Sequence, residues 1–218
     1  MIAHLLTAVL WGAFGALVGY GMREGTVRLT RAEGLEPGFK DWQVYGPPIL
    51  SGLLFALFGG VVGPQWVLLI RSVWMAVLVQ VIFFDLEHHL ILDRVMFPSM
   101  AAAIVLSIFT PGLGILQSVL TGIGAGVVFL LIAGLGAIIF KAEALGFGDV
   151  KLAVFIGLIT GWPLAASALL YGVVLAGVIS ILLVVLRVRS MRDSIAYGPF
   201  MAAGTLIVLF LISIGAAQ

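Results

Sequence analysis

Long hydrophobic runs alternate with short polar segments along most of the 218-residue chain. A segment that crosses a bilayer needs roughly 20 mainly apolar residues, and somewhat fewer inside a helical bundle. The pattern therefore predicts an all-α polytopic membrane protein with about eight transmembrane helices, of which the second and the sixth are the shortest. The expected spans are Ile2–Met22, Pro48–Val62, Trp66–Phe84, Val95–Thr110, Leu116–Phe140, Asp149–Thr160, Pro163–Leu186 and Tyr197–Ala216.

The polar segments between these spans are too short to fold independently. The largest, residues 23–47, mixes charges with glycine and proline and has no room for a core of its own. We therefore expect one membrane-embedded domain over residues 1–218, with a short cytoplasmic loop at about 23–47. Small residues four positions apart are expected to let neighbouring helices pack closely. These pairs are Gly15/Gly19 and Gly122/Gly126.

Lysine and arginine residues gather on every second connection between the expected spans. They lie after the first and third spans, around the connection of the fifth and sixth, and after the seventh. Because basic loops accumulate on the cytoplasmic side, these connections and the acidic residues beside them are expected in the cytoplasm, with both termini outside. Arg71, near the start of the third span, is the exception, and its long side chain is expected to reach outward to the interface.

Composition supports the membrane assignment and narrows the function. With 62% hydrophobic and 10% charged residues, the chain has too little polar surface to cover a soluble globule. The net charge is only +1 and both signs share the same loops, so no nucleic-acid partner is expected. The chain has no cysteine, which excludes disulfides, thiolate zinc ligands and cysteine nucleophiles.

The densest polar cluster, residues 83–94, follows the third apolar run. Two interpretations are open. The cluster is either a solvated loop with the ordinary charge mix of a membrane interface, or the setting of a functional carboxylate. In the second interpretation Asp85, the first charge after an unbroken apolar run, is held at the membrane edge for catalysis, because an ionisable group there is costly unless it is used.

A second carboxylate stands at the mouth of the sixth span, in Gly146-Phe-Gly148-Asp149. With 28 glycines in the chain, this tetrapeptide alone is weak evidence. Its two glycines let another backbone, or a peptide substrate, approach closely, and they lead into a helix that begins with the carboxylate. Two aspartates at one membrane depth are suited to the acid–base pair of an aspartic protease, in which one activates water and the other polarises the peptide carbonyl.

These residues resemble a known family. Asp85-Leu-Glu-His-His-Leu-Ile-Leu-Asp93, followed 64 positions after Asp85 (149 − 85) by the Gly-Phe-Gly-Asp149-Val-Lys-Leu segment, closely resembles the type IV prepilin peptidases, the leader peptidases among the Gly-x-Gly-Asp intramembrane aspartic proteases. The segment 195–201 is similar to the Phe-Gly-Pro-Phe motif of that family's last span. The resemblance extends from about Phe83 to the C-terminus.

The resemblance implies that Asp85 and Asp149 are the catalytic pair of a membrane aspartic endopeptidase. The substrates would be prepilin or pseudopilin precursors, cut at the cytoplasmic membrane face between a short basic leader and an apolar helix. The protein would be a multi-pass protein of a prokaryotic plasma membrane, in contact with the lipid bilayer. An alternative of another class is a proton-coupled transporter or channel component, in which aspartates at the membrane edge relay protons.

The N-terminal region departs from the family pattern. Many bacterial members carry a cytoplasmic insert with paired Cys-x-x-Cys motifs that bind zinc, and this insert is associated with N-methylation of the new N-terminus. A chain without cysteine and with only a brief segment at residues 23–46 is expected to bind no zinc and to need no cofactor. N-methyltransferase activity is therefore not expected.

Several other polar residues are interpreted as motif or substrate-binding residues. Lys151 either biases the carboxylates or holds the substrate backbone, or it is a positive-inside anchor. Glu87 and Asp93 either attract a basic leader or are solvated loop charges. His88, His89, Glu87 and Asp93 are residue types that can bind a metal ion. Adjacent histidines point in different directions on a helix, however, so no metal is expected. The candidate set comprises Gly146, Gly148, Lys151, Glu87, His88 and Asp93.

The ends of the two spans suggest different roles for the two aspartates. If Asp149 opens a helix, the helix dipole favours its charged form, whereas Asp85 at the end of a helix lies where negative charge is disfavoured. We hypothesise that Asp149 is mainly the charged member of the resting pair and Asp85 the proton carrier, although a coupled pair titrates as a unit.

Overall fold

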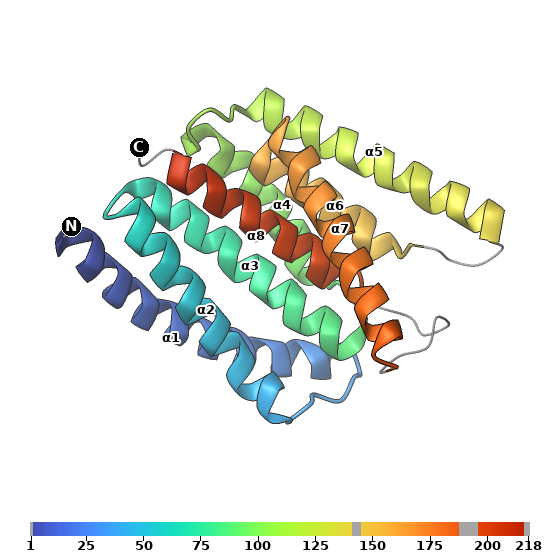
Figure 1. Cartoon of the computed structure of the whole chain (residues 1–218), viewed down its shortest axis with the longest axis horizontal. Coiled ribbons are helices and arrows are strands. Elements are labelled where there is room, and N and C mark those ends of the chain that lie inside the picture. Colours follow the sequence, from blue (N-terminus) through green and yellow to red (C-terminus); the bar gives the residue numbers. More distant parts are fainter. Residues whose placement is uncertain (1, 141–144, 188–195, 216–218) are drawn as a thin grey trace. The chain divides into compact units, whose positions relative to one another are not determined.

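The computed structural model describes residues 2–140, 145–187 and 196–215, and within these ranges the chain is helical, with no strand (Figure 1). Six of the helices are long and apolar enough to cross a membrane, and α4 and α6, with 14 residues each, are shorter. The prediction of an all-α polytopic membrane protein is confirmed. The helices are α1 Ile2–Ala32, α2 Asp41–Val62, α3 Trp66–His88, α4 Asp93–Leu106, α5 Ile115–Phe140, α6 Phe147–Thr160, α7 Leu164–Val185 and α8 Gly198–Gly215.

The first helix extends well beyond the expected end at Met22. Past that residue α1 is polar on its outer side, but it still buries one residue in every three or four, namely Arg23, Thr26 and Thr30. This spacing matches the 3.6-residue period of a helix. The hydropathy pattern missed the extension because the side chains that pack here are polar.

The second helix begins seven residues before the expected Pro48. The side chain of Gln43 accepts a hydrogen bond from the backbone N–H of Lys40 at 2.9 Å, which satisfies a free donor at the start of α2. The segment between α1 and α2 is therefore 33–40, and most of residues 23–47 are helical. The second span has 22 residues, so the expectation that it is short is wrong; the two short helices are α4 and α6.

The described chain divides into two compact units. Unit 1 comprises Met1–His88 and Leu209–Gln218, and unit 2 comprises His89–Val208. Asp85 belongs to unit 1 and Asp149 to unit 2.

Unit 1 is built on a close pairing of α1 with α2, and both helices contact α3 (Figure 1). A Cβ on Gly15 would lie 2.6 Å from the Cβ of Phe55, and one on Gly19 would lie 2.5 Å from the carbonyl oxygen of Pro47. Any side chain at these two positions would push the helices apart, so the expected role of this glycine pair is confirmed. The core of the unit includes Phe55, Phe58, Leu68, Met75, Leu78 and Phe84.

Arg71 of unit 1 has a polar partner near the end of α8, and the expectation that its head reaches the interface stays a prediction. Its Nη1 donates a hydrogen bond to the Oγ of Ser213, and that hydroxyl in turn donates to the carbonyl oxygen of Leu209 at 2.7 Å. The guanidinium is thus held within unit 1 by a neutral partner.

Unit 2 is organised around α6, which contacts α4, α5 and α7. Nine of the 14 residues of α6 are buried. A Cβ on Gly126 would lie 2.5 Å from Cγ2 of Val154, and one on Gly122 would lie 2.8 Å from the side chain of Leu158. The second glycine pair therefore also acts in close helix packing, as expected.

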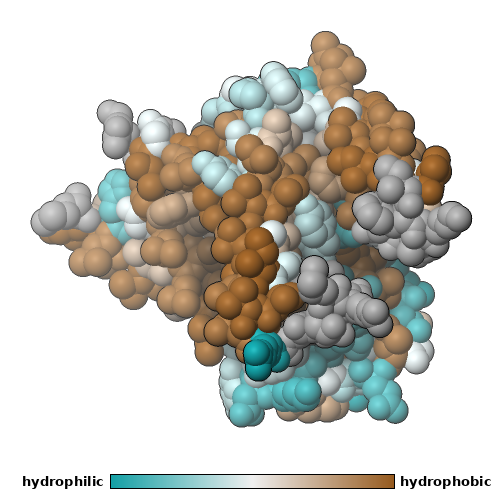
Figure 2. Space-filling view, turned by 45° about the vertical axis from the view of Figure 1, so that its right-hand side comes forward, coloured by the Kyte–Doolittle hydropathy of each residue, from teal (hydrophilic) through white to brown (hydrophobic). Residues whose placement is uncertain are grey.

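The outer surfaces of the helices are strongly apolar. Hydrophobic residues cover most of the face drawn in Figure 2. Large apolar side chains such as Leu17, Leu53, Leu116 and Ile181 are more than half exposed. Exposed hydrophobic surface of this extent is expected where helices meet lipid.

Candidate active site

Asp149 lies in the first turn of α6, as the sequence predicted. Its Oδ2 accepts a hydrogen bond from the backbone N–H of Gly146 at 3.2 Å, and its own N–H donates to the carbonyl oxygen of Gly146 at 3.1 Å. This is the carboxylate half of a capping box, which satisfies a donor that the helix leaves free. The helix dipole adds to the effect because a negative charge is stabilised at a helix N-terminus.

The two glycines of the Gly-x-Gly-Asp motif have different surroundings. A Cβ on Gly148 would lie 3.1 Å from the Cβ of Ile91, whose side chain is buried. Among the residues that the structure describes, a Cβ on Gly146 would meet only Oδ2 of Asp149, at an ordinary 3.5 Å, and a backbone nitrogen at 4.0 Å. The close approach expected for the motif is therefore made at Gly148, and its partner is the chain's own segment just before α4.

Lys151 is bound to groups of unit 2. Its Nζ forms an ion pair with Oδ1 of Asp93, the first residue of α4. The ammonium also lies over the rings of Phe97, at 5.4 Å, and Phe147, at 5.0 Å. The structure thus brings together two candidate residues, Lys151 and Asp93, and ties the start of α4 to the start of α6. The Lys151 side chain is 18% exposed and that of Asp93 is 53% exposed.

Tyr197 is a neighbour of Asp149 that the sequence analysis did not single out. It precedes α8 directly, and its carbonyl oxygen accepts the N–H of Phe200 at 3.1 Å. Burial and the negative charge of Asp149 raise the pKa of the Tyr197 hydroxyl above its ordinary value. The only available signal was the 195–201 motif itself, in which a tyrosine stands where the family pattern has phenylalanine.

Asp85 lies in the last turn of α3, three residues before the helix ends at His88. Its side chain is buried, with 5% of the residue exposed. The ring of Phe84 packs against that of His88, with centroids 4.8 Å apart. The expectation that Asp85 stands near a helix C-terminus, where a negative charge is disfavoured, is confirmed.

Glu87 binds the chain itself and does not extend from the surface. It forms an ion pair with Arg23 of α1 at 3.3 Å, and the two side chains are only 4% and 6% exposed. The backbone N–H of Gly38 donates to the second oxygen of Glu87, while the Arg23 guanidinium donates to the carbonyl oxygen of Gly38. Glu87 and Arg23 together therefore fix the segment between α1 and α2 against the end of α3.

His88 completes this cluster in unit 1. Its Nε2 lies 3.3 Å from Oε1 of Glu87, and its side chain is 10% exposed. Asp93, which a metal site with His88 would also have required, is bound to Lys151 in unit 2. Among the residues that the structure describes, no group of three histidine or carboxylate side chains is arranged to hold a metal ion.

Neither Arg23 nor Gly38 was a candidate residue. Arg23 was interpreted as one of several basic loop residues, and nothing in its neighbours along the chain distinguishes it from Arg28 or Arg31. Its partner Glu87 lies 64 positions away. Sequence reasoning had no signal for this contact apart from the helical spacing of Arg23, Thr26 and Thr30.

Comparison with known proteins places this chain among membrane peptidases. A model described as the type IV leader peptidase family matches residues 72–181, a range that contains Asp85, Asp93, Asp149 and Lys151. The matched range covers just over half of the chain and leaves out α1, α2 and α8. No solved structure matches the chain significantly.

Curated relatives agree with the family model. The chain is 29% identical over 143 residues to a prepilin leader peptidase/N-methyltransferase of Myxococcus xanthus, which covers 65% of this chain and 42% of that protein. It is 25% identical over 161 residues to the protein of that name from Aeromonas salmonicida, covering 74% and 55%. The corresponding values for the Legionella pneumophila protein are 23% over 146 residues, 67% and 50%. The chain thus spans about half the length of these relatives.

Proposed function

Because the chain belongs to the type IV leader peptidase family, we propose that it is a membrane aspartic endopeptidase that removes the basic leader from type IV prepilin-like precursors. The observation that carries the proposal is the family match over residues 72–181, within which Asp85 and Asp149 each occupy the end of a helix. Cleavage takes place at the cytoplasmic membrane face, where the leader meets the apolar helix of the precursor. Prepilin and pseudopilin precursors are the substrate class.

The two helix ends divide the acid–base work between the aspartates. Asp149, at the N-terminus of α6, is the carboxylate that takes a proton from the attacking water. Asp85, at the C-terminus of α3, carries the proton that passes to the scissile carbonyl oxygen. The water oxygen bonds to the carbonyl carbon and gives a neutral gem-diol. Collapse of this gem-diol breaks the C–N bond. The proton gained by Asp149 passes to the leaving amine, and one gem-diol hydroxyl returns its proton to Asp85, so both carboxyl groups regain their starting states.

The proposal is limited to proteolysis in a plasma membrane. The relatives' names also include N-methyltransferase, but the chain spans about half of their length and contains no cysteine with which to hold the zinc associated with that activity in the family. The chemistry described above needs only water and two carboxyl groups. No cofactor, metal or nucleic acid is therefore assigned.

The deciding experiment is cleavage of a prepilin-like precursor in liposomes by the wild type, Asp85→Asn and Asp149→Asn. Each variant is expected to lose at least about 10²- to 10⁴-fold in rate, the usual contribution of a general acid or base. Glu24→Gln, which removes an exposed carboxylate of α1, is the control and keeps full activity. Full cleavage by both Asp variants would refute the assignment, and absence of cleavage by the wild type would favour a proton-coupled transporter instead.

The orientation of the chain in the membrane can be tested by labelling single introduced cysteines, because the chain has no cysteine of its own. Glu36→Cys places a single thiol in the exposed segment between α1 and α2. Gly114→Cys places one before α5, where an added Cβ has no atom of the described part of the chain within 4 Å. A membrane-impermeant maleimide is expected to label residue 36 only from the cytoplasmic side and residue 114 only from outside. The reverse pattern would remove the proposed cytoplasmic cleavage site.

A further inference from the structure

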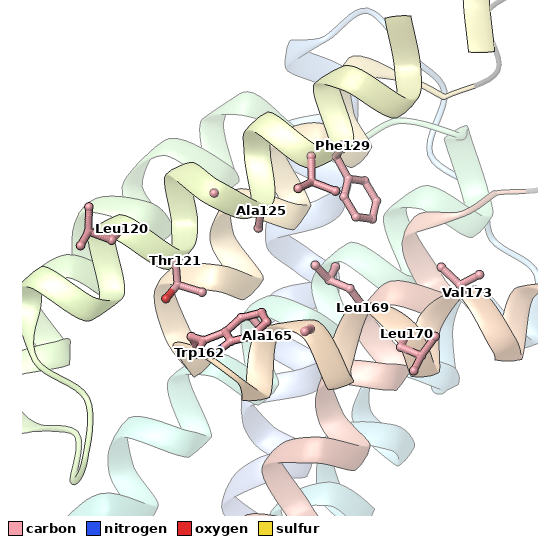
Figure 3. A pocket seen from close by; sticks show the side chains of 12 residues that line it. Leu120, Thr121, Ala125, Phe129, Trp162, Ala165, Leu169, Leu170 and Val173 are labelled. Atoms are coloured by element: carbon pink, nitrogen blue, oxygen red, sulfur yellow. The ribbon is translucent and has the colours of Figure 1, made fainter. Parts of the chain in front are cut away.

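A large apolar groove opens between α5 and α7 in unit 2 (Figure 3). Its volume is about 620 Å³. One wall is the side of α5 from Leu120 to Phe129, and the opposite wall is the start of α7 from Ala165 to Val173. Trp162 lies at one end of the groove and Phe129 toward the other (Figure 3). No lining residue is charged, and the Thr121 hydroxyl is one of the few polar side-chain groups in the lining.

The two helices that form the groove, α5 and α7, both contact α6, the helix that carries Asp149. Helices α5 and α6 pack antiparallel, because Gly122 lies against Leu158 and Gly126 lies against Val154. The same register places Phe129 level with Lys151, two residues after Asp149 on α6. The Trp162 end of the groove adjoins the last residue of α6, Thr160. The groove therefore extends from the far end of α6 to the level of Lys151, within one helical turn of Asp149.

The dimensions and lining suit a helical segment. From Leu120 to Phe129 the wall is about 14 Å long at 1.5 Å per residue, the length of roughly nine helical residues. Small residues form much of the lining, and small residues at a membrane interface let two helix backbones approach closely. These are Gly124, Ala125, Ala165 and Ala166.

We propose that the α5/α7 groove receives the apolar helix of the prepilin-like precursor. This inference rests on the proposed function. The first turns of the precursor helix lie between α5 and α7, with their N-terminal end at Phe129 and their continuation toward Trp162. This placement brings the junction between leader and helix to within one helical turn of the level of Asp149, where cleavage is proposed. The groove is thus a docking surface that selects substrates by the apolar segment that follows the cleaved bond.

The first test fills the groove without disturbing the fold. No described residue lies within 4 Å of a Cβ added at Gly124, so the side chain of Gly124→Leu grows into the groove. Gly134→Leu is the matched control, since an added Cβ at Gly134, also on α5, meets no described atom within 4 Å and Gly134 does not line the groove. Two substrates are compared: the full precursor in liposomes, and a soluble peptide that ends a few residues past the cleavage junction.

The expected result is a rise in KM of about tenfold for the full precursor with Gly124→Leu, equivalent to about 1.4 kcal/mol. Gly134→Leu stays at the wild-type value, and the short peptide is cut equally by all three proteins. Wild-type kinetics of Gly124→Leu on the full precursor would overturn the docking proposal. An equal loss on both substrates would also overturn it, because the substitution would then act on the cleavage machinery and not on the helix.

The second test does not depend on cleavage. Ala166→Cys and Gly177→Cys each place one thiol on α7, the first in the groove and the second outside it. A precursor with a thiol-reactive group in the first turns of its apolar helix is expected to cross-link to residue 166 and not to residue 177. Cross-linking without cleavage would leave the docking surface standing and refute the peptidase proposal. Equal labelling at residues 166 and 177 would overturn the docking proposal. Displacement of a co-purified phospholipid by Gly124→Leu, with no effect on cross-linking, would identify the groove as a lipid site instead.

Discussion

The last turn of α3 and the first turn of α6 each carry one of the proposed catalytic aspartates, and they are held in different ways. Beside Asp85, the carboxylate of Glu87 is buried with Arg23, a residue 64 positions away on α1. Beside Asp149, the carboxylate accepts a local bond from the N–H of Gly146, and the nearby pair of Lys151 with Asp93 is partly exposed. Both settings include a contact between distant parts of the chain, but the ion pair beside Asp85 is buried and the one beside Asp149 is not.

The difference in burial sets the energetics of the two ion pairs. Removing one partner of a buried pair leaves an uncompensated charge in the low-dielectric protein interior. An exposed pair competes with water and contributes little to stability. The Arg23 and Glu87 side chains are 6% and 4% exposed, against 18% and 53% for Lys151 and Asp93. Matched substitutions in the two pairs therefore test whether the two helix ends are held as differently as the structure indicates.

The largest effect is expected for Arg23→Met. It leaves the Glu87 carboxylate buried without its cation and removes the bond to the carbonyl oxygen of Gly38. We expect a loss of about 3–5 kcal/mol in the free energy of unfolding, measured by denaturant titration in mixed micelles. The double variant Arg23→Met/Glu87→Met should recover most of that loss, because no charge is then left buried. If Arg23→Met lowered the free energy of unfolding by no more than Lys151→Met does, the two helix ends would not be held differently.

A smaller effect is expected within the Gly-x-Gly-Asp motif. In Gly148→Ala the new Cβ lies 3.1 Å from the Cβ of Ile91, a buried and β-branched side chain that has little freedom to move. We expect a loss of about 1–3 kcal/mol in stability and reduced cleavage, because the turn that holds Asp149 must shift. Gly146→Ala is the control and should cost far less, since its Cβ meets nothing closer than 3.5 Å among the described residues. Equal losses for the two variants would show that the contact with Ile91 is not what constrains the motif.

These two helix ends also show what the sequence could and could not predict. The start of α6 was predictable because a glycine-rich entry, a first-turn carboxylate and an apolar run are all local signals. The extension of α1 to Ala32 and the start of α2 at Asp41 were not, because hydropathy reports lipid contact and the packing there is polar. The partner of Glu87 was also out of reach, since a single sequence carries no information on contacts between α1 and α3. The catalytic assignment of Asp85 and Asp149 stays a prediction.

The exposed pair should respond weakly to the matched substitution. Lys151→Met removes the ion pair with Asp93 and the contacts of the ammonium with two rings, but keeps the length of the apolar stem. We expect a loss of at most about 1 kcal/mol, measured in the same micelles as Arg23→Met. The cleavage rate of Lys151→Met distinguishes between two roles for this residue. A fall in rate far beyond the loss of stability would indicate a direct role with the substrate, whereas a parallel fall would indicate that Lys151 only joins α4 to α6.

The smallest effect concerns Tyr197 and is a shift in its pKa. Burial and the negative charge of Asp149 both raise the pKa of this hydroxyl, because each disfavours the tyrosinate anion. Asp149→Asn removes the second cause and keeps the first, so the pKa of Tyr197 should fall but stay above the ordinary value of 10.0.

Tyrosinate absorbance is titrated in Asp149→Asn, and the same titration of Asp149→Asn/Tyr197→Phe is subtracted. Asp93→Asn, which removes another carboxylate of unit 2, should leave the pKa of Tyr197 where it is in the wild type. A pKa that does not move in Asp149→Asn would mean that Tyr197 lies outside the electrostatic reach of Asp149.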